Sequence, residues 1–342
     1  MRRLWIKSML RDQILGGRKT MRFTLQWHIT NACEAHCTHC YDRNDYNALP
    51  LDTCLTILQD FQSFCNAHKV HGQISLTGGN PLLHPNFWEL YKAIADANIP
   101  ASILGNAVDD TILSRLFAIK RPVYYQVSLE GMPETNDSIR GSGHYQRTME
   151  FLQLARVYGL TTHVMLTLHK ENIGQVIPLG ISLESLVRKF TFNRLAQVGE
   201  GAALAIPTHE EYISFLHEYL TAAKQHPVLG FKDNLFNIIR HKNKKSYFDG
   251  CTGYGCGAAF NFVAVLPNGE VHACRKFPSL IGQLPVKTLA EIYNSPLAHK
   301  YRKGPTACRH CKIRHHCRGC LAVIHSQGGN PFIDCDPQCF MK

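Results

Sequence analysis

The chain of 342 residues lacks both a membrane-spanning run and the apolar core of a secretory signal. A membrane helix needs about 18 or more consecutive apolar residues, and no stretch of this chain approaches that length. Near the N-terminus the apolar residues 4–6 are followed at once by Lys7, so no signal-peptide core forms. These absences predict a cytoplasmic protein that acts without a membrane partner.

Charged residues are sparse, at 18% of the chain, and an apolar content of 45% is ordinary for a globular protein. The formal net charge of +11 is weak evidence for a nucleic-acid partner. The densest basic run, residues 241–245, contains no aromatic residue and is more typical of a solvated linker. Cysteines that bind metal as thiolates would lower the net charge further, so nucleic acid is not an expected partner.

Cysteine, by contrast, is abundant, with 14 residues. A disulfide framework is typical of small secreted domains, which does not fit a chain of this length without a secretory signal. A reducing compartment directs most of the cysteines towards metal binding. Cys54 and Cys65 are exceptions, because they lie on the apolar stripe of a predicted helix and are expected in its core.

Strand-like and helical segments alternate from Phe23 onward. The strand-like segments are residues 23–30, 73–77, 101–104, 123–129, 162–168 and 190–196, and helical segments follow at 51–68, 86–97, 110–120, 145–158 and 172–188. Six such units predict a parallel sheet, either a partial barrel or an open doubly wound sheet. In both forms the site lies at the carboxyl ends of the strands. Further helical segments are predicted at 209–226 and 234–241.

Cys33, Cys37 and Cys40 follow the first strand in a Cys-x3-Cys-x2-Cys spacing. A four-iron cluster normally takes four cysteines, so three on one loop would leave one iron without a protein ligand. The alternative is a structural zinc site, which closes with four ligands. His36 or His39 could then supply the fourth ligand.

Two further motifs stand at strand ends: Gly78-Gly79-Asn80-Pro81 after the second strand, and Ser128-Leu129-Glu130-Gly131 after the fourth. Each alone is also typical of a plain turn. Together with the cysteine triplet, they give residues 23–201 a resemblance to the radical S-adenosylmethionine (radical SAM) enzymes. The resemblance extends over residues 134–141, which are similar to the corresponding segment of the peptide-modifying branch. It implies a partial (β/α)6 TIM-like barrel within an α/β fold.

The resemblance also implies roles for individual residues. Cys33, Cys37 and Cys40 would hold a 4Fe-4S cluster whose open iron is chelated by S-adenosylmethionine. Gly78, Gly79 and Asn80 would face the methionyl amine, Ser128 and Glu130 the ribose hydroxyls, and Arg140 the carboxylate. A carboxylate accepts hydrogen bonds from a diol, and a guanidinium suits a carboxylate. The sequence departs from the family at Asn80, where Glu is more common. It also departs at His39, which stands before the third cysteine in place of the usual aromatic ring.

Nine of the 14 cysteines lie from Cys251 onward. Zinc knuckles are one interpretation of their Cys-x2-Cys units. Their order, however, resembles the SPASM extension of radical SAM enzymes, which houses two auxiliary 4Fe-4S clusters. That resemblance assigns Cys251, Cys256, Cys274 and Cys320 to the first auxiliary cluster, and Cys308, Cys311, Cys317 and Cys339 to the second. The Cys317-x2-Cys320 spacing is one residue shorter than is usual, and Cys335 is left as a spare thiol.

The sequence therefore predicts an N-terminal extension (1–22), a radical SAM core (23–201), a helical linker (202–250) and a Cys-rich SPASM domain (251–342). The implied function is that of a peptide maturase with three 4Fe-4S clusters. S-adenosylmethionine would be cleaved reductively to a 5′-deoxyadenosyl radical, which abstracts hydrogen from a ribosomally made precursor peptide. A flavodoxin or ferredoxin would donate electrons. The short segment before the first strand suggests a separate leader-peptide-binding protein. The alternatives are a radical SAM enzyme acting on a small molecule or RNA, and a non-catalytic zinc protein that binds nucleic acid.

Overall fold

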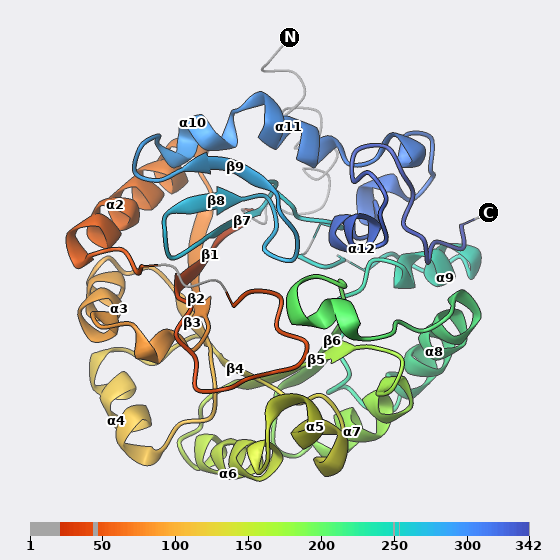
Figure 1. Cartoon of the computed structure of the whole chain (residues 1–342), viewed down its shortest axis with the longest axis horizontal. Helices are drawn as coiled ribbons and strands as arrows, with labels where there is room; N and C mark the ends of the chain where they lie inside the picture. Colours follow the sequence, from red (N-terminus) through yellow and green to blue (C-terminus); the bar gives the residue numbers. More distant parts are fainter. Residues whose placement is uncertain (1–20, 44–46, 249, 253, 342) are drawn as a thin grey trace.

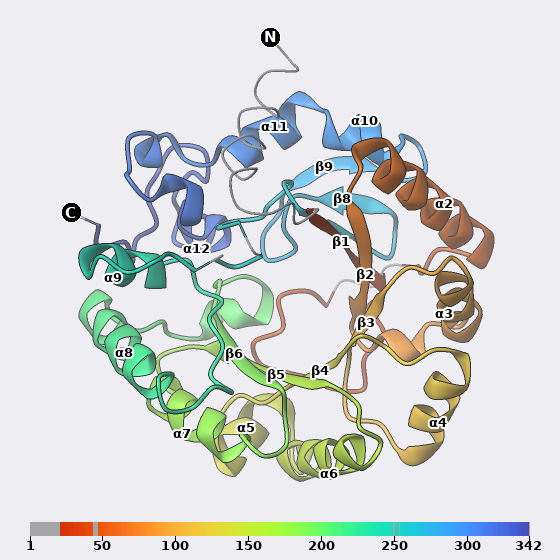
Figure 2. The same cartoon turned by 180° about the vertical axis from the view of Figure 1, so that it is seen from behind.

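The computed structural model describes residues 21–43, 47–248, 250–252 and 254–341. Its strands form one nine-stranded sheet with the order β6-β5-β4-β3-β2-β1-β7-β8-β9. The first six strands are parallel and curve around a central space, with the helices outside them (Figures 1 and 2). The strands are β1 (Arg22–Thr30), β2 (His71–Gly78), β3 (Ala101–Leu104), β4 (Tyr125–Ser128), β5 (Thr162–Leu168), β6 (Lys189–Arg194), β7 (Phe262–Val265), β8 (Glu270–His272) and β9 (Leu280–Gln283). The predicted partial barrel of six βα units is confirmed.

The helices of the barrel agree with the predicted segments except near their ends. The α-helices are α2 (Leu51–His68), α3 (Phe87–Asp96), α4 (Asp110–Ile119), α5 (Pro133–Arg140), α6 (His144–Val157), α7 (Val176–Ser182), α8 (His209–Ala222), α9 (Phe236–Lys242), α10 (Leu289–Tyr293), α11 (Pro296–Lys303) and α12 (Leu321–Ser326). Helix α8 ends at Ala222, four residues earlier than predicted, and residues 223–225 form a turn before Pro227, which disfavours a helical residue 226. The predicted helix 172–188 is a short 3₁₀ turn, Ile173–Gln175, followed by α7.

Helix α5 was not predicted, although its sequence carries a start signal. Pro133 occupies its first turn, where the missing N–H costs nothing and the fixed φ suits the helix. The helix ends at Arg140 and is followed by Gly141, which has a φ of 100°. Helix α5 therefore places Arg140 near the barrel mouth.

The C-terminal region continues the barrel sheet. Strand β7 pairs in parallel with β1, and β8 and β9 follow in antiparallel order. The prediction of a Cys-rich C-terminal extension did not include this continuation. Because β7 and β1 are hydrogen-bonded, the C-terminal region extends the barrel sheet beyond its first strand.

The core lies between the strands and the surrounding helices. In one part of it, Phe23 of β1, Phe64 of α2 and Tyr293 of α10 form an aromatic cluster with ring centroids 4.7–5.6 Å apart, a range typical of favourable pairs. Cys54 and Cys65 of α2 are buried in the same core, as predicted. No helix in the described part of the chain is long and apolar enough to cross a membrane.

Candidate active site

A cavity of about 1880 Å³ occupies the inside of the barrel. This volume exceeds the roughly 300–1,000 Å³ of common ligand pockets. Cys33, Cys37, Cys40, Gly78, Gly79, Ser128 and Arg140 all line it, as do Cys251, Cys256, Cys274 and Cys320. The fold thus brings most of the predicted core site and the predicted first auxiliary group to one space.

The cysteine loop follows β1 and crosses the barrel mouth, where it is drawn in red to orange in Figure 1. Its three thiols are half-buried and free. Cys33 and Cys40 lie close enough to Cys37 to raise the pKa of its thiol, although burial is the larger cause and Arg140 opposes it. Arg140 Nη1 is 3.6 Å from Cys37 Sγ, and Asn106 Nδ2 is 3.7 Å from Cys33 Sγ. Such donors stabilise thiolate ligands of an iron–sulfur cluster, so the loop fits that group.

The two glycines of the Gly-Gly motif bring the β2 end against the cysteine loop. The Gly79 N–H donates to Thr30 O over 2.8 Å, and the Asn80 N–H donates to Ala32 O over 2.8 Å. A Cβ at Gly78 would lie 2.0 Å from Thr30 O, and a Cβ at Gly79 would lie 2.3 Å from Ala32 O. A side chain at either position would therefore displace the loop.

Asn80 does not line the cavity, in contrast to the role that the resemblance implied. It is buried, and its Nδ2 donates to both carboxylate oxygens of Glu34 at 3.0 and 3.2 Å. Glu34 faces a smaller neighbouring cavity of about 580 Å³, which Arg140 also lines. A carboxylate therefore lies beside Asn80 even though position 80 itself carries none.

Glu130 is fully buried and also lies off the main cavity. Its Oε1 accepts from Arg140 Nε at 2.9 Å and lies 3.0 Å from His39 Nε2, and its Oε2 accepts from the Thr167 N–H at 2.7 Å. Burial alone would raise the pKa of this carboxyl, but Arg140 and His39 hold it well below its usual range. In this arrangement Glu130 orients Arg140 and the cysteine loop, and Ser128 is the β4 residue that faces the cavity.

The predicted first auxiliary group is assembled from three separate segments. Burial raises the pKa of Cys274 to about 12, with contributions from Cys320 and Cys256, and Cys256 likewise raises the pKa of Cys251. These four thiols are therefore electrostatic neighbours. Thiols with raised pKa values are deprotonated by the metal that they bind, so the donor set fits a cluster.

The predicted second auxiliary group lies outside the cavity. Burial raises the pKa of Cys308 to about 11, and Cys311 and Cys339 add to the shift. Cys339 also lies near Cys317, which is buried. The spare thiol, Cys335, is exposed and interacts with Cys308 and Cys339, so the structure brings it to this group as well.

A single-ion site would need three or more ligands close together. No group of three His, Cys, Asp or Glu side chains within the described ranges is arranged to hold one metal ion.

Sequence reasoning missed the polar lining supplied by the strands themselves. The cavity-facing residues from β1, β2, β4, β5 and β6 include Thr24, Gln26, His28, Ser75, Thr77, Gln126, His163, Met165, Thr167, Thr191 and Asn193. In β1, β5 and β6 they alternate with buried apolar residues such as Phe23, Val164 and Phe192. This alternation with a period of two is the signal of a strand with one polar face, and it could have been recognised from the sequence.

Comparisons with known proteins agree with this geometry. Residues 27–179 match the model of the radical SAM superfamily, and residues 256–320 match the model of SPASM, an iron–sulfur cluster-binding domain. The chain is 26% identical over 312 residues to the antilisterial bacteriocin subtilosin biosynthesis protein AlbA of Bacillus subtilis, covering 86% of this chain but just under two thirds (66%) of AlbA. It is 26% identical over 337 residues to mycofactocin maturase MftC of Mycobacterium ulcerans, covering 92% of this chain and 87% of MftC.

A relative with a different activity in its name is the AdoMet-dependent heme synthase of Methanosarcina barkeri, which is 23% identical over 93% of this chain and 96% of that protein. Among solved structures, Streptococcus suis SuiB bound to precursor peptide SuiA matches with a TM-score of 0.73 and 18% identity, over 94% of this chain and 76% of SuiB. The structure of anSMEcpe with bound AdoMet and a Cp18Cys peptide matches with a TM-score of 0.70 and 16% identity, over 93% and 94%. At these identities, the solved structures establish a shared fold.

Proposed function

Because the chain is a radical SAM superfamily enzyme with a SPASM iron–sulfur domain, we propose that it modifies a ribosomally made precursor peptide. The observation that carries the proposal is the shared cavity. It places the Cys33-Cys37-Cys40 loop, Ser128 and Arg140 in the same space as Cys251, Cys256, Cys274 and Cys320. A cavity of about 1880 Å³ has room for a cofactor and a segment of a substrate chain.

The names of two relatives, AlbA and MftC, describe a bacteriocin biosynthesis protein and a maturase. SuiB, which has the same fold, was solved with a precursor peptide. These likenesses favour a peptide as the substrate class.

The 4Fe-4S cluster of the cysteine loop, when bound with S-adenosylmethionine, supplies a 5′-deoxyadenosyl radical able to abstract hydrogen from the substrate. The chain's own residues bind and orient the reactants and keep water away from them. Cys33, Cys37 and Cys40 would hold the cluster. Arg140, fixed by Glu130, offers its Nη1 side to the loop and the cofactor carboxylate, and Ser128 offers a hydroxyl to the ribose.

Glu34 is a further candidate for binding S-adenosylmethionine. The family more often has Glu at the position of Asn80, where it would pair with the methionyl amine. Here Asn80 holds the Glu34 carboxylate through two hydrogen bonds, next to a cavity that Arg140 also lines. We assign the contact with the methionyl amine to Glu34, and Asn80 is the residue that positions its carboxylate. Gly78 and Gly79 allow the close approach between the two loops.

The remaining ligands would hold two auxiliary 4Fe-4S clusters, for a total of three. Cys251, Cys256, Cys274 and Cys320 would hold the first, and Cys308, Cys311, Cys317 and Cys339 would hold the second. Four cysteines for each cluster leave no open iron, which suits electron transfer or structural support. A flavodoxin or ferredoxin would serve as electron donor, and a separate protein would bind the leader peptide.

The second candidate is a small-molecule substrate, because one relative is a heme synthase. Incubation of the reconstituted, reduced holoenzyme with S-adenosylmethionine distinguishes the two candidates. One arm contains synthetic peptides for any short reading frames that sequencing finds beside the gene, another contains the porphyrin in the name of a further relative, an Fe-coproporphyrin III synthase, and a third has no substrate. We expect a peptide to raise 5′-deoxyadenosine release and to change in mass. If only coproporphyrin raised release and was itself altered, the peptide proposal would be wrong.

A further inference from the structure

The main cavity has an excess of positive side chains that are not neutralised by the acidic residues around it. Among the residues that the structure describes, the carboxylates that line it are those of Asp42 and Asp233. Asp42 pairs with Arg275, and Asp233 pairs with Arg194, whose Nε lies 2.7 Å from Asp233 Oδ2. Both of these carboxylates therefore already form ion pairs with arginines.

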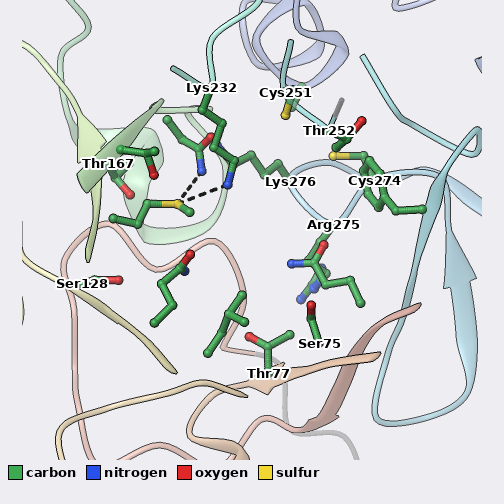
Figure 3. A pocket seen from close by; sticks show the side chains of 18 of the residues that line it. Ser75, Thr77, Ser128, Thr167, Lys232, Cys251, Thr252, Cys274, Arg275 and Lys276 are labelled. Carbon is green, nitrogen blue, oxygen red and sulfur yellow. Dashed lines mark hydrogen bonds between the residues drawn. The ribbon is translucent and has the colours of Figure 1, made fainter. Parts of the chain in front are cut away.

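Lys232 and Lys276 are the half-buried lysines of this lining. Lys232 Nζ is 3.7 Å from Met165 Sδ, and Lys276 Nζ is 3.3 Å from Arg194 O. In the described part of the chain neither lysine forms an ion pair. Figure 3 shows both side chains entering the cavity on the side of Cys251 and Cys274, across from Ser75 and Thr77.

The two ammonium groups influence each other. The half-buried Lys232 has Lys276 and Lys189 as charged neighbours of the same sign, and Cys251 also lies near it. Burial lowers the pKa of His163 on β5 to about 4, with contributions from Lys189 and Lys232. An unpaired buried charge is costly, so this part of the cavity favours an anion.

Many of the strand residues that line the cavity are uncharged and able to form hydrogen bonds. Thr24, Ser75, Gln126, Thr191 and Asn193 contribute hydroxyl and amide groups from four strands. These groups suit the polar backbone of an extended peptide, whereas the ammonium groups of the lysines suit a group with negatively charged oxygens, such as a carboxylate. The anionic group of S-adenosylmethionine itself is already assigned to Arg140.

We propose that Lys232 and Lys276 bind a carboxylate of the substrate, an inference that rests on the proposed peptide function. The carboxylate belongs either to an Asp or Glu side chain or to the C-terminus of the peptide. The pair would seat this group beside Cys251 and Cys274 and so fix which part of the peptide lies in front of the Cys33-Cys37-Cys40 loop.

Charge balance for the first auxiliary cluster is the rival explanation, because Cys251 and Cys274 lie near Lys232. The two roles differ in what they affect. A role in charge balance would change iron content and the reduction potential of that cluster, whereas a role in substrate binding would change the affinity for carboxylates with iron content unchanged.

The test measures peptide binding to the anaerobically reconstituted holoenzyme with S-adenosylmethionine, by calorimetry. Three synthetic peptides serve as probes: acetyl-Gly-Gly-Glu-Gly-amide, acetyl-Gly-Gly-Gly-Gly with a free C-terminal carboxylate, and acetyl-Gly-Gly-Gln-Gly-amide. The variants are Lys232→Met, Lys276→Met, their combination, and the charge-conserving Lys232→Arg. Lys287→Met is the matched control, because Lys287 is exposed and lies outside the cavity. Iron content and cluster potential are measured on each.

We expect one of the two carboxylate peptides to bind at least about tenfold more tightly than the Gln peptide, as charge-assisted hydrogen bonds would give. The better binder identifies the source of the carboxylate. The preference should vanish in the Lys232→Met/Lys276→Met combination, with iron retained, and persist in Lys232→Arg and Lys287→Met.

Equal affinity for all three peptides in the wild-type protein, including no measurable binding of any, would overturn the proposal. So would methionine variants that lose iron or shift the cluster potential while keeping the preference. Because binding is measured without turnover, a failure of the peptide function itself would be recognised separately, as absent stimulation of 5′-deoxyadenosine release despite a preserved carboxylate preference.

Discussion

At the scale of single residues, the site depends on side chains that do not face the cavity. Glu130 was predicted to bind the ribose, but its two oxygens are already held by Arg140, His39 and the Thr167 N–H. The sequence identified this residue as important because of its place after the fourth strand. It could not show which way the carboxylate points, because that depends on Arg140, ten residues later, returning on the unpredicted helix α5.

Replacing Glu130 by Gln tests this positioning role. The substitution keeps the shape of the side chain and leaves Arg140 without its buried partner, so we expect the folded state to lose about 3–5 kcal/mol of stability. The thermal midpoint of unfolding measures the loss. Glu134→Gln, on the exposed face of the same helix, is the control and should unfold like the wild type. A variant as stable as this control would show that the ion pair contributes little.

Replacing Gly79 by Ala tests the close approach of the two loops. The new Cβ would lie 2.3 Å from Ala32 O, so the cysteine loop must move and its cluster should be lost. We expect about four fewer irons per chain than in the wild type, with the auxiliary clusters kept. In Gly174→Ala the new Cβ meets open space, and iron content should stay unchanged. Full iron content in Gly79→Ala would contradict the assigned role of this glycine.

At the scale of elements, β6 is connected to the C-terminal cysteines through a buried network. Arg194, the last residue of β6, donates from Nη2 to Asp336 Oδ2 over 2.7 Å and from Nη1 to Gln338 Oε1 over 3.0 Å. Asp336 Oδ2 also accepts from the Cys320 N–H over 2.8 Å. One carboxylate thus connects the barrel to the loops of both predicted auxiliary clusters.

Arg194→Met should loosen these loops. The variant leaves Asp233 and Asp336 buried without their shared partner, and breaking a buried ion pair typically costs about 3–5 kcal/mol. We expect a lower thermal midpoint and faster loss of iron to a chelator. The neighbouring Arg188 is exposed, so Arg188→Met serves as the matched control. Equal rates of iron loss in the two variants would argue against the network.

The elements themselves were largely predictable. The strands and helices of the barrel follow from the alternation of apolar segments, and the cysteine loop falls at the end of β1 because a parallel sheet places its site there. The pairing of β7 with β1 was not predictable in this way. It is a long-range contact between short strands, and no local pattern identifies the partner of a four-residue strand such as Phe262–Val265.

At the scale of the whole molecule, several buried histidines should make stability depend on pH. Burial lowers the pKa of His144 to about 4 and of His163 to about 4, and it holds the pKa of His28 well below 6.5. Between pH 6.5 and 4 the unfolded chain binds more protons than the folded one, so stability rises with pH across this window.

We therefore expect the thermal midpoint to fall as pH decreases from 7 to 5. His163→Gln removes one of these groups without adding a charge, and its midpoint should fall less over the same interval. His217, exposed on α8, provides the control variant His217→Gln. A midpoint with no dependence on pH between 7 and 5 would contradict the account of buried neutral histidines.

The central claim is that Cys33, Cys37 and Cys40 form the site at which S-adenosylmethionine is cleaved. The most direct measurement is 5′-deoxyadenosine release by the reduced holoenzyme and by Cys37→Ala, each with its iron content determined. The wild type should hold about twelve irons and release 5′-deoxyadenosine, and Cys37→Ala should keep about eight irons and release none. A Cys37→Ala variant that still cleaved S-adenosylmethionine, or a wild-type protein containing zinc and no sulfide, would contradict the account.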